Sequence, residues 1–336
     1  MKYFIPSCTT ALLGMAAACF FLATGDTTTI GAPMERGIFL AEMEQGKYDE
    51  AGALLNREED LRGYLTVPIP EDADESDISI ENNITDKSVS IIVKNVPLDF
   101  YHKNIFSGDM SNISSVKYGY VDNEAIIMLT SEDIVEADTR YGNGHLYIRL
   151  VDPHYAHKKV LVVDPGHGGD DNGSVVYGIS EKSIINGVVS KLKKSLDSSD
   201  YGVYYTRVND RELSEEERVS FIRSVSADLV ISIHTDANTK SRAVKGCSAA
   251  TRSENAKIAG SFLDSLSLNC AVKNNGVVDG STLSMIVDDG SPTVFLHLGN
   301  LTNRAEAEVM STDEFQTKAA EAIKNSILEY LNSEKD

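Results

Sequence analysis

The sequence lacks the cysteine pattern of several small metal-binding and disulfide-rich classes. Only four cysteines occur in 336 residues, and two of them, Cys8 and Cys19, lie in an apolar stretch at the N-terminus. The other two, Cys247 and Cys270, form no CxxC spacing, which excludes a zinc ribbon. In an oxidising compartment Cys247 and Cys270 could form a disulfide, and two buried free thiols are the alternative.

Positive charge is also scarce. Lys and Arg number 31 against 51 Asp and Glu, a net charge of −20, and residues 41–80 alone hold twelve acidic and three basic side chains. A surface of this sign repels phosphate backbones and anionic headgroups, so nucleic-acid binding is excluded. Apolar residues make up 42% and charged residues 24% of the chain, which excludes both wholesale disorder and a multi-span membrane protein.

Residues 1–26 are predicted to be a signal peptide or an N-terminal membrane anchor. Lys2 precedes an uncharged, mainly apolar stretch from Tyr3 to Ala23, and polar residues follow it. At about 20 residues, the stretch is longer than a typical signal core and nearly long enough to cross a bilayer. Both alternatives predict an exported protein that is extracellular, in the cell wall, or tethered to the membrane and facing outward.

The next part of the chain divides by its hydrophobic period. Residues 27–65 are predicted to be a helical segment, because apolar residues such as Leu40, Met43 and Leu54 recur at helical spacing. Residues 66–77, with two prolines and an acidic cluster, are predicted to be a solvated linker. Residues 78–155 are predicted to form a small β domain, because apolar and polar residues alternate there and Asp122-Asn123 suits a hairpin turn. Strands are expected at 88–93, 115–120, 125–129 and 145–150.

Residues 156–333 are predicted to form an α/β domain in which helices flank a mostly parallel, mixed sheet. Strand patterns alternate with helix patterns, beginning with the continuous apolar run Val160–Val163, which is typical of a buried central strand. Further strands are expected at 203–205, 229–233, 283–287 and 293–296. The last helix is expected to begin with Ser311 and Glu314 in capping-box spacing.

Two histidines lie within a few residues of predicted strand ends, where ligands bind in open parallel sheets. His167 is in the loop Asp164-Pro165-Gly166-His167-Gly168-Gly169, and His234 ends the run Ser232-Ile233-His234. Glu181 begins the first predicted helix and can add one carboxylate. Two imidazoles and a carboxylate make a three-ligand zinc site with one open position for water. The glycine-rich loop does not suit a phosphate, because no GK[ST] sequence follows and aspartates flank it.

On these motifs, residues 159 to about 332 resemble the zinc-dependent N-acetylmuramoyl-L-alanine amidases that carry the DPGHGG motif, the amidase_3 type. Four of the family's motifs follow in order: Asp164–Gly169, Gly178–Lys182, Thr206–Asp210 with Arg218 in the next helix, and Ala227–His234. The resemblance implies Zn²⁺ held by His167, Glu181 and His234, with peptidoglycan as the substrate and hydrolysis of the amide between muramic acid and L-alanine as the reaction. Whether a protein activator takes part is not indicated.

One motif departs from the family. The family's last segment contains a catalytic glutamate that acts as acid and base, and His297 stands at that position here. His297 could replace the glutamate as a base, or it could become a fourth zinc ligand that closes the site. The third alternative is a catalytically impaired homologue that binds cell-wall glycan or regulates wall hydrolysis. Glu306, which matches a trailing glutamate of the motif, is expected to support the loop, and Asp288 and Asp289 are outside candidates for the base.

The β domain stands where members of this family often carry AMIN, a small wall-targeting β-sandwich. The likeness is one of position and strand content, and an interdomain spacer is the alternative.

Overall fold

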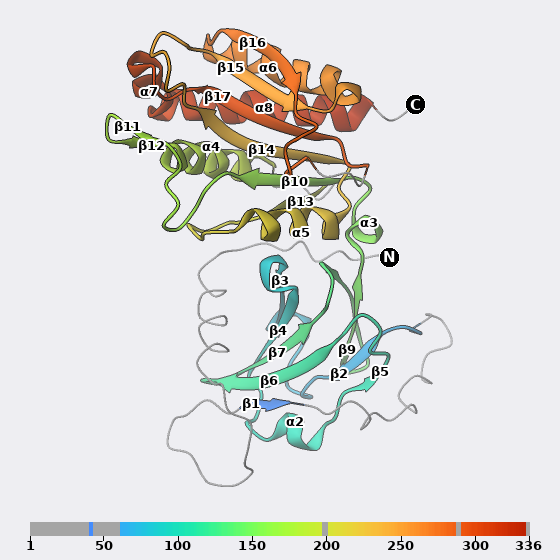
Figure 1. The fold of residues 1–336 in the computed structure, drawn as a ribbon. Helices are drawn as coiled ribbons and strands as arrows, with labels where there is room; N and C mark the ends of the chain where they lie inside the picture. Colours follow the sequence, from blue (N-terminus) through green and yellow to red (C-terminus); the bar gives the residue numbers. More distant parts are fainter. Residues whose placement is uncertain (1–39, 43–60, 197–200, 287–289, 334–336) are drawn as a thin grey trace. The chain divides into compact units, whose positions relative to one another are not determined.

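The computed structural model describes residues 40–42, 61–196, 201–286 and 290–333, and the chain divides into two compact units, residues 1–156 and 157–336 (Figure 1). The signal peptide or anchor expected at residues 1–26 lies outside the described residues, as do Asp288 and Asp289. Among the described residues, no helix has the length and apolar character to cross a membrane.

Two antiparallel sheets make up the first unit. One has the order β1 (Leu40–Glu42), β6 (Ser115–Val121), β7 (Glu124–Thr130), β4 (Ser88–Lys94) and β3 (Ile78–Asn83). The other has the order β5 (Ser107–Gly108), β2 (Leu65–Pro68), β9 (His145–Val151) and β8 (Glu136–Gly142). The short helices α2 (Phe100–Lys103) and α3 (Pro153–Ala156) and the 3₁₀ turns η2 (Glu75–Asp77) and η3 (Ile84–Asp86) connect or follow these strands.

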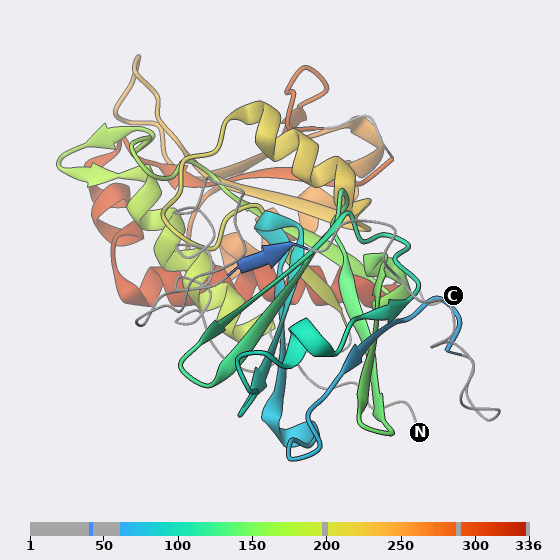
Figure 2. The same ribbon diagram turned by 90° about the horizontal axis from the view of Figure 1, so that it is seen from below.

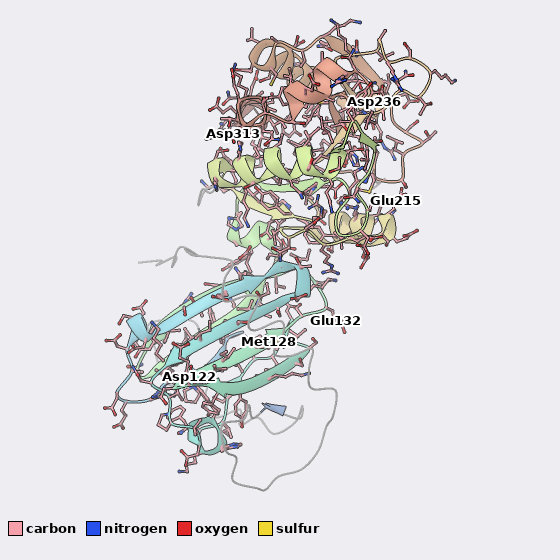
Figure 3. All side chains as sticks on the ribbon, turned by 90° about the vertical axis from the view of Figure 1, so that its left-hand side faces the viewer. Asp122, Met128, Glu132, Glu215, Asp236 and Asp313 are labelled. Atoms are coloured by element: carbon pink, nitrogen blue, oxygen red, sulfur yellow. The ribbon has the colours of Figure 1, made fainter. Side chains whose placement is uncertain are left out.

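Side chains from both sheets share one core, which makes the first unit a β-sandwich. Val89, Ile91 and Val93 of β4 and Ile148 of β9 are among its buried members. Asp122, labelled in Figure 3, sits at the expected turn between β6 and β7, and its φ is +54°. This backbone conformation is tolerated best by Gly, Asn and Asp, which explains the turn chemistry.

The structure corrects two expectations for the first unit. Residues 40–42, inside the expected helical segment 27–65, form a strand that pairs with Lys117–Gly119 of β6, and Leu65 begins β2. The expected linker 66–77 is not a solvated segment, because it starts inside β2 and buries Val67, Ile69 and Ala73 in the core. The acidic residues and prolines masked an alternation of buried apolar positions that is typical of a strand.

The second unit is built on a six-stranded mixed sheet, which confirms the predicted fold class. The strand order is β13 (Gly202–Tyr205), β10 (Val160–Pro165), β14 (Leu229–Asp236), β17 (Thr293–Asn300), β15 (Cys247–Thr251) and β16 (Asn274–Asp279). Strands β13, β10, β14 and β17 are parallel, and β15 runs antiparallel to β17. A small hairpin, β11 (Val175–Val176) and β12 (Ile179–Ser180), stands apart from this sheet.

Helices cover both faces of the sheet. Figure 2 shows α5 (Glu215–Val225) on one face and α4 (Glu181–Leu196) and α8 (Asp313–Ser333) on the other, and α6 (Ala256–Cys270) packs against α8. The remaining elements are α7 (Arg304–Met310) and the 3₁₀ turn η4 (Ser253–Asn255). Because the chain leaves β10 for β13 on one side and then returns to β14 on the other, the carboxyl ends of β10 and β14 flank a topological switch point, where ligands bind in such sheets.

Two details of the second unit differ from the sequence predictions, and one open alternative is decided. Residues 283–286 form turns in place of the expected strand, while β15 and β16 supply the strands that the sequence pattern did not indicate. Helix α8 begins at Asp313, and the hydroxyl of Thr312 rather than Ser311 accepts the N–H of Phe315 at 3.2 Å. Cys247 and Cys270 are both free thiols, and burial raises the pKa of each to about 11.

Candidate metal centre

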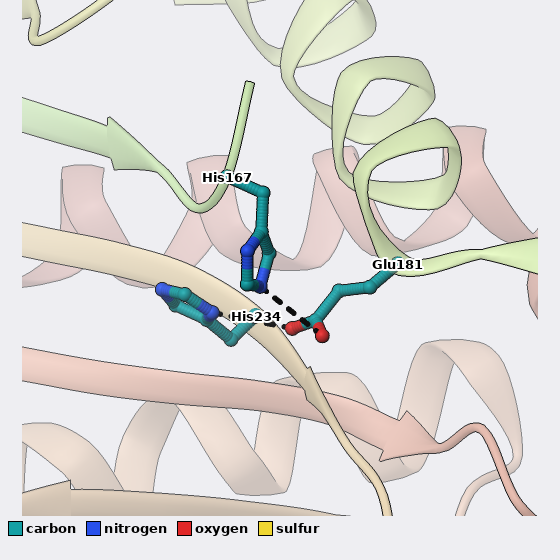
Figure 4. Close-up of side chains that lie close together, drawn as sticks. All are labelled: His167, Glu181 and His234. Carbon is teal, nitrogen blue, oxygen red and sulfur yellow. Dashed lines mark hydrogen bonds and ion pairs between the residues drawn. The ribbon is translucent and has the colours of Figure 1, made fainter. Parts of the chain in front are cut away.

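Three side chains that are far apart in the sequence meet at the carboxyl ends of β10 and β14. His167 follows β10, His234 lies within β14, and Glu181 is the first residue of α4 (Figure 4). Nε2 of His167 lies 3.1 Å from one carboxylate oxygen of Glu181, and Nδ1 of His234 lies 3.2 Å from the other. The three ligand atoms lie within 4.8 Å of one another, so this group could hold a metal ion.

Two glycines make room for this approach. A Cβ atom at position 166 would lie 2.3 Å from Cε1 of His234, and one at position 173 would lie 2.6 Å from Nε2 of His167. Such distances are far below van der Waals contact, so any larger residue at Gly166 or Gly173 would push a histidine out of place. His167 itself adopts a φ of +59°, which turns its side chain toward Glu181 at the expense of backbone strain.

Neighbouring groups fix the orientation of the candidate ligands. Nδ1 of His167 lies 2.7 Å from the carboxylate of Asp171, which leaves Nε2 directed at Glu181. The backbone N–H groups of Thr235 and Ser174 donate to the two oxygens of Glu181 at 2.8 and 3.2 Å. A carboxylate behind a ligand histidine is a common feature of metal sites, because it sets the tautomer and the ring orientation.

The electrostatics of the group favour a bound cation. Burial alone would raise the pKa of Glu181, but hydrogen bonds with His167, His234 and the Thr235 N–H hold that pKa well below its usual range. Burial lowers the pKa of His167, and the carboxylates of Glu181 and Asp171 more than offset it, so the net pKa is raised. The lowered pKa keeps Glu181 in its carboxylate form beside two imidazoles, and a cation can take the place of a proton there.

Two arginines hold the loop that presents His167. Arg218 of α5 donates to the carbonyls of Pro165 and His167, each at 2.7 Å, and Arg207 donates to the carbonyl of Gly166 at 2.7 Å. Arg218 also pairs with the fully buried carboxylate of Asp164 at 2.6 Å. Consecutive carbonyl oxygens of the loop are thus satisfied by guanidinium donors, which fixes the backbone around the candidate ligand.

The other motif residues support the same loops. Lys182, next to Glu181, donates to the carbonyl of Gly169 at 2.5 Å and pairs with Asp210, whose carboxylate also accepts the Gly169 N–H at 3.0 Å. Glu306 accepts the N–H groups of Gly246 and Asn300 at 2.9 and 2.7 Å. Glu306 therefore ties the segment after β17 to the start of β15 and does not face the metal centre as a replacement base.

His297 lies beside the group of three without joining it. It is on β17, opposite His234 in the parallel pairing of β14 and β17, and the centroids of the two rings are 6.5 Å apart. Phe295, on the same side of β17, stacks on the ring of His234 at 4.4 Å. Burial and the neighbouring His234 lower the pKa of His297, so its imidazole is neutral over a wider pH range than an exposed histidine.

Sequence reasoning missed one functional neighbour, Asp171. The sequence draws attention to Asp171 only as a charge that repels phosphate, whereas its carboxylate orients His167. The separation of four residues between His167 and Asp171 is the signal, but it becomes informative only when the strained turn between them brings the two side chains together.

Comparison with known proteins matches the second unit. A family model described as N-acetylmuramoyl-L-alanine amidase matches residues 161–329. The protein YqiI of Bacillus subtilis is 30% identical over 179 residues, covering 52% of this chain and 85% of YqiI. The amidase LytC of B. subtilis is 27% identical over 176 residues, covering 51% of this chain and 35% of LytC. The germination-specific amidase of B. subtilis is 27% identical over 194 residues, covering 53% of this chain and 82% of that protein.

A solved structure agrees on the fold. The crystal structure of an N-acetylmuramoyl-L-alanine amidase from Clostridium difficile 630 superposes with a TM-score of 0.50 at 24% identity, and the match covers 52% of this chain and 98% of that one.

Proposed function

Because the chain belongs to the N-acetylmuramoyl-L-alanine amidase family, we propose that it hydrolyses the amide bond between N-acetylmuramic acid and L-alanine in peptidoglycan. The observation that carries this proposal is the convergence of His167, Glu181 and His234 at the carboxyl end of the sheet. The family match covers the strands and the helix that present all three residues.

We further propose that the metal is zinc, held by His167, Glu181 and His234. Two imidazole nitrogens and one carboxylate are a common catalytic zinc set, and Asp171 supplies the carboxylate that such sites place behind a histidine. When bound, zinc polarises a carbonyl group and lowers the pKa of a water molecule to about 7. The chain itself holds the three ligands at the carboxyl end of the sheet. Backbone N–H groups donate to Glu181, and guanidinium groups donate to the carbonyls of the His167 loop.

His297 is proposed to stand in for the acid/base glutamate of the family, at a cost in rate. A carboxylate at this position would offset the charge of the metal while it holds a proton, whereas a protonated imidazole would add a positive charge beside a cation. The lowered pKa of His297 points the same way, because the neutral form can accept a proton but releases it readily to solvent. Slow hydrolysis at neutral pH is therefore expected.

His297 at the position of the family's glutamate also favours a second candidate function, a wall-binding homologue with little or no hydrolysis. These alternatives differ in the release of new ends from the polymer. Digestion of purified peptidoglycan by the zinc-loaded chain, with free muramic acid and L-alanine ends identified, tests the choice. Release of both ends supports the amidase, and binding without release supports the wall-binding homologue.

We also propose that the first unit is an AMIN-like wall-targeting domain and that the protein is exported or tethered through its N-terminus. Support for the first proposal comes from the two-sheet sandwich, which has the architecture expected of such a domain. The uncharged stretch from Tyr3 to Ala23 supports the second. Co-sedimentation of the chain with intact sacculi, compared with residues 157–336 alone, tests the targeting role.

A further inference from the structure

The β11–β12 hairpin places an exposed tyrosine next to the metal centre. Tyr177 and Gly178 form its two-residue turn, with φ values of +56° and +78°. Glycine and asparagine suit such a turn, and a tyrosine there is strained, which is common at ligand-binding positions. Tyr177 precedes Glu181 by four residues, so the tip of the hairpin lies within about 13 Å of that candidate ligand along extended chain.

Two arginines from other loops gather on the ring of Tyr177. The guanidinium carbon of Arg242 lies 5.9 Å from the ring centroid, and that of Arg304 lies 5.7 Å from it. Arg242 is in the loop after β14, the strand of His234, and Arg304 begins α7, just after the strand of His297. Figures 1 and 2 both show the hairpin beside α7.

Hydrogen bonds from side chains to backbone carbonyls hold these three segments together. The hydroxyl of Tyr177 donates to the carbonyl of Thr302 at 3.1 Å, and the side-chain amide of Asn303 donates to the carbonyl of Arg242 at 3.1 Å. Tyr177 precedes Glu181 by four residues, Arg242 follows His234 by eight, and Arg304 follows His297, the neighbour of the centre, by seven. Tyr177, Arg242 and Arg304, called the rim below, therefore lie on loops that adjoin α4, β14 and β17, the elements of Glu181, His234 and His297.

Much of the donor capacity of these arginines is unused. Within the described residues, no carboxylate pairs with Arg242, and Glu308 takes only the Nε of Arg304, at 2.9 Å. Both side chains are exposed, in a chain with a net charge of −20. On the other loops around the centre, Asp170 and Asp171 are exposed without a lysine or arginine partner among the described residues, and Asp210 pairs with Lys182 at 3.0 Å.

We propose that Arg242 and Arg304, positioned by Tyr177, bind a free carboxylate of the stem peptide within the first three residues beyond the scissile amide. This inference rests on the proposed function and adds a substrate preference to it. The planar fork of a guanidinium matches a carboxylate through paired N–H donors, and an aromatic face holds the fork in place. An extended peptide advances about 3.5 Å per residue, so its second or third residue reaches the hairpin when the scissile amide is at the centre.

The preference can be measured by binding, without relying on cleavage. The probes are muramoyl tripeptides that carry either a free carboxylate or a carboxamide on the second residue, each with a free or amidated C-terminus. Binding to the full chain is followed by calorimetry after treatment with a chelator, which prevents hydrolysis. The chain is compared with an Arg242→Gln/Arg304→Gln variant and with Arg223→Gln, which removes an exposed charge from α5, away from the rim.

We expect the unmodified chain to bind one of the acidic probes at least roughly tenfold more tightly than its amidated partner, as a charge-assisted hydrogen bond allows. The double variant should lose this difference, and Arg223→Gln should keep it. Equal binding of the acidic and amidated probes, or a difference that survives in the double variant, would overturn the proposal, as would competition by inorganic phosphate in place of any carboxylate preference. A carboxylate preference with no cleavage by the zinc-loaded chain would count against the proposed amidase activity and not against this subsite.

Discussion

At the residue scale, Asp171 is the side chain whose contribution can be isolated most cleanly. Among the described residues, its carboxylate hydrogen-bonds with the far nitrogen of the candidate ligand His167 and accepts the N–H of Gly173. We expect Asp171→Asn to lower zinc affinity by about 10- to 100-fold, because a neutral amide no longer fixes the tautomer of the ligand or raises its basicity. Competition with a chromogenic chelator measures this change.

The neighbouring Asp170 supplies the control. It is exposed and its side chain makes no hydrogen bond to the candidate ligands, so Asp170→Asn removes the same charge from the same loop. Its zinc affinity should stay close to that of the unmodified chain. If both variants lose affinity equally, the effect is one of loop charge and Asp171 has no orienting role.

The buried pair of Asp164 and Arg218 governs stability as well as loop geometry. Burial alone would raise the pKa of Asp164, but Arg218 and the hydroxyls of Thr206 and Ser232 hold that pKa below its usual value. A lowered folded-state pKa contributes stability that is present above the unfolded pKa of about 3.9 and is lost as the pH falls through the folded value.

We therefore expect Arg218→Met to lower the free energy of unfolding by about 3–5 kcal/mol at pH 7, because it leaves the Asp164 charge buried without a partner. The penalty should shrink below about pH 4, where the carboxyl group can be neutral. Urea denaturation at both pH values measures it, with the exposed Arg223→Met on the same helix as the control. Equal stability of Arg218→Met and Arg223→Met at pH 7 would show that the pair contributes nothing net.

At the scale of elements, the sequence predicted those whose hydrophobic pattern is unambiguous. The buried run of β10 and the apolar face of α8, with Phe315 and Ile323, were placed correctly because a central strand and a long amphipathic helix each carry many matching positions. Strands β15 and β16 were not predicted, because their sequences, CSAAT and NNGVVD, contain few large apolar residues. Their position at one side of the sheet is set by the pairing of β15 with β17 and of β16 with β15, which is information that the local sequence does not hold.

Part of the candidate site could be predicted from the sequence, namely the residues that lie on recognisable strands and helices. His167 and His234 were identifiable because each lies at or near the end of a recognisable strand, and Glu181 because it begins a recognisable helix. The rim residue Tyr177 was not identifiable, since its importance comes from arginines 65 and 127 positions further along the chain. Contacts between loops of this kind depend on the assembled fold and leave no periodic trace in the sequence.

The start of α8 allows a test of one local assignment. Thr312 accepts the N–H of Phe315, whereas the hydroxyl of Ser311 donates to the carbonyl of Ala307 in the preceding helix. We expect Thr312→Ala to lower the free energy of unfolding by about 1 kcal/mol, the typical value of an N-cap hydroxyl, and Ser311→Ala to lower it by less. Thermal denaturation of the two variants decides the order, and the reverse order would favour the capping box expected from the sequence.

At the scale of the whole molecule, the acidic chain combines a β-sandwich unit with an α/β unit of the amidase family. The second unit carries the two arginines of the rim. The negative surface keeps the protein away from other polyanions, while Arg242 and Arg304 provide a local exception beside the metal centre. In this account, recognition of peptidoglycan would be divided between the first unit, which targets the wall, and the rim of the second, which selects the peptide.

We propose that this chain is a zinc amidase whose rate is limited by His297. The most direct measurement is the rate at which zinc-loaded protein releases L-alanine amino termini from purified peptidoglycan. We expect slow release by the unmodified chain, none above background by His167→Ala, and an increase of at least roughly 10²-fold on His297→Glu, the contribution typical of a positioned general acid and base. Rapid release by the unmodified chain that is lost on His297→Glu would contradict the account, and so would release that persists in His167→Ala.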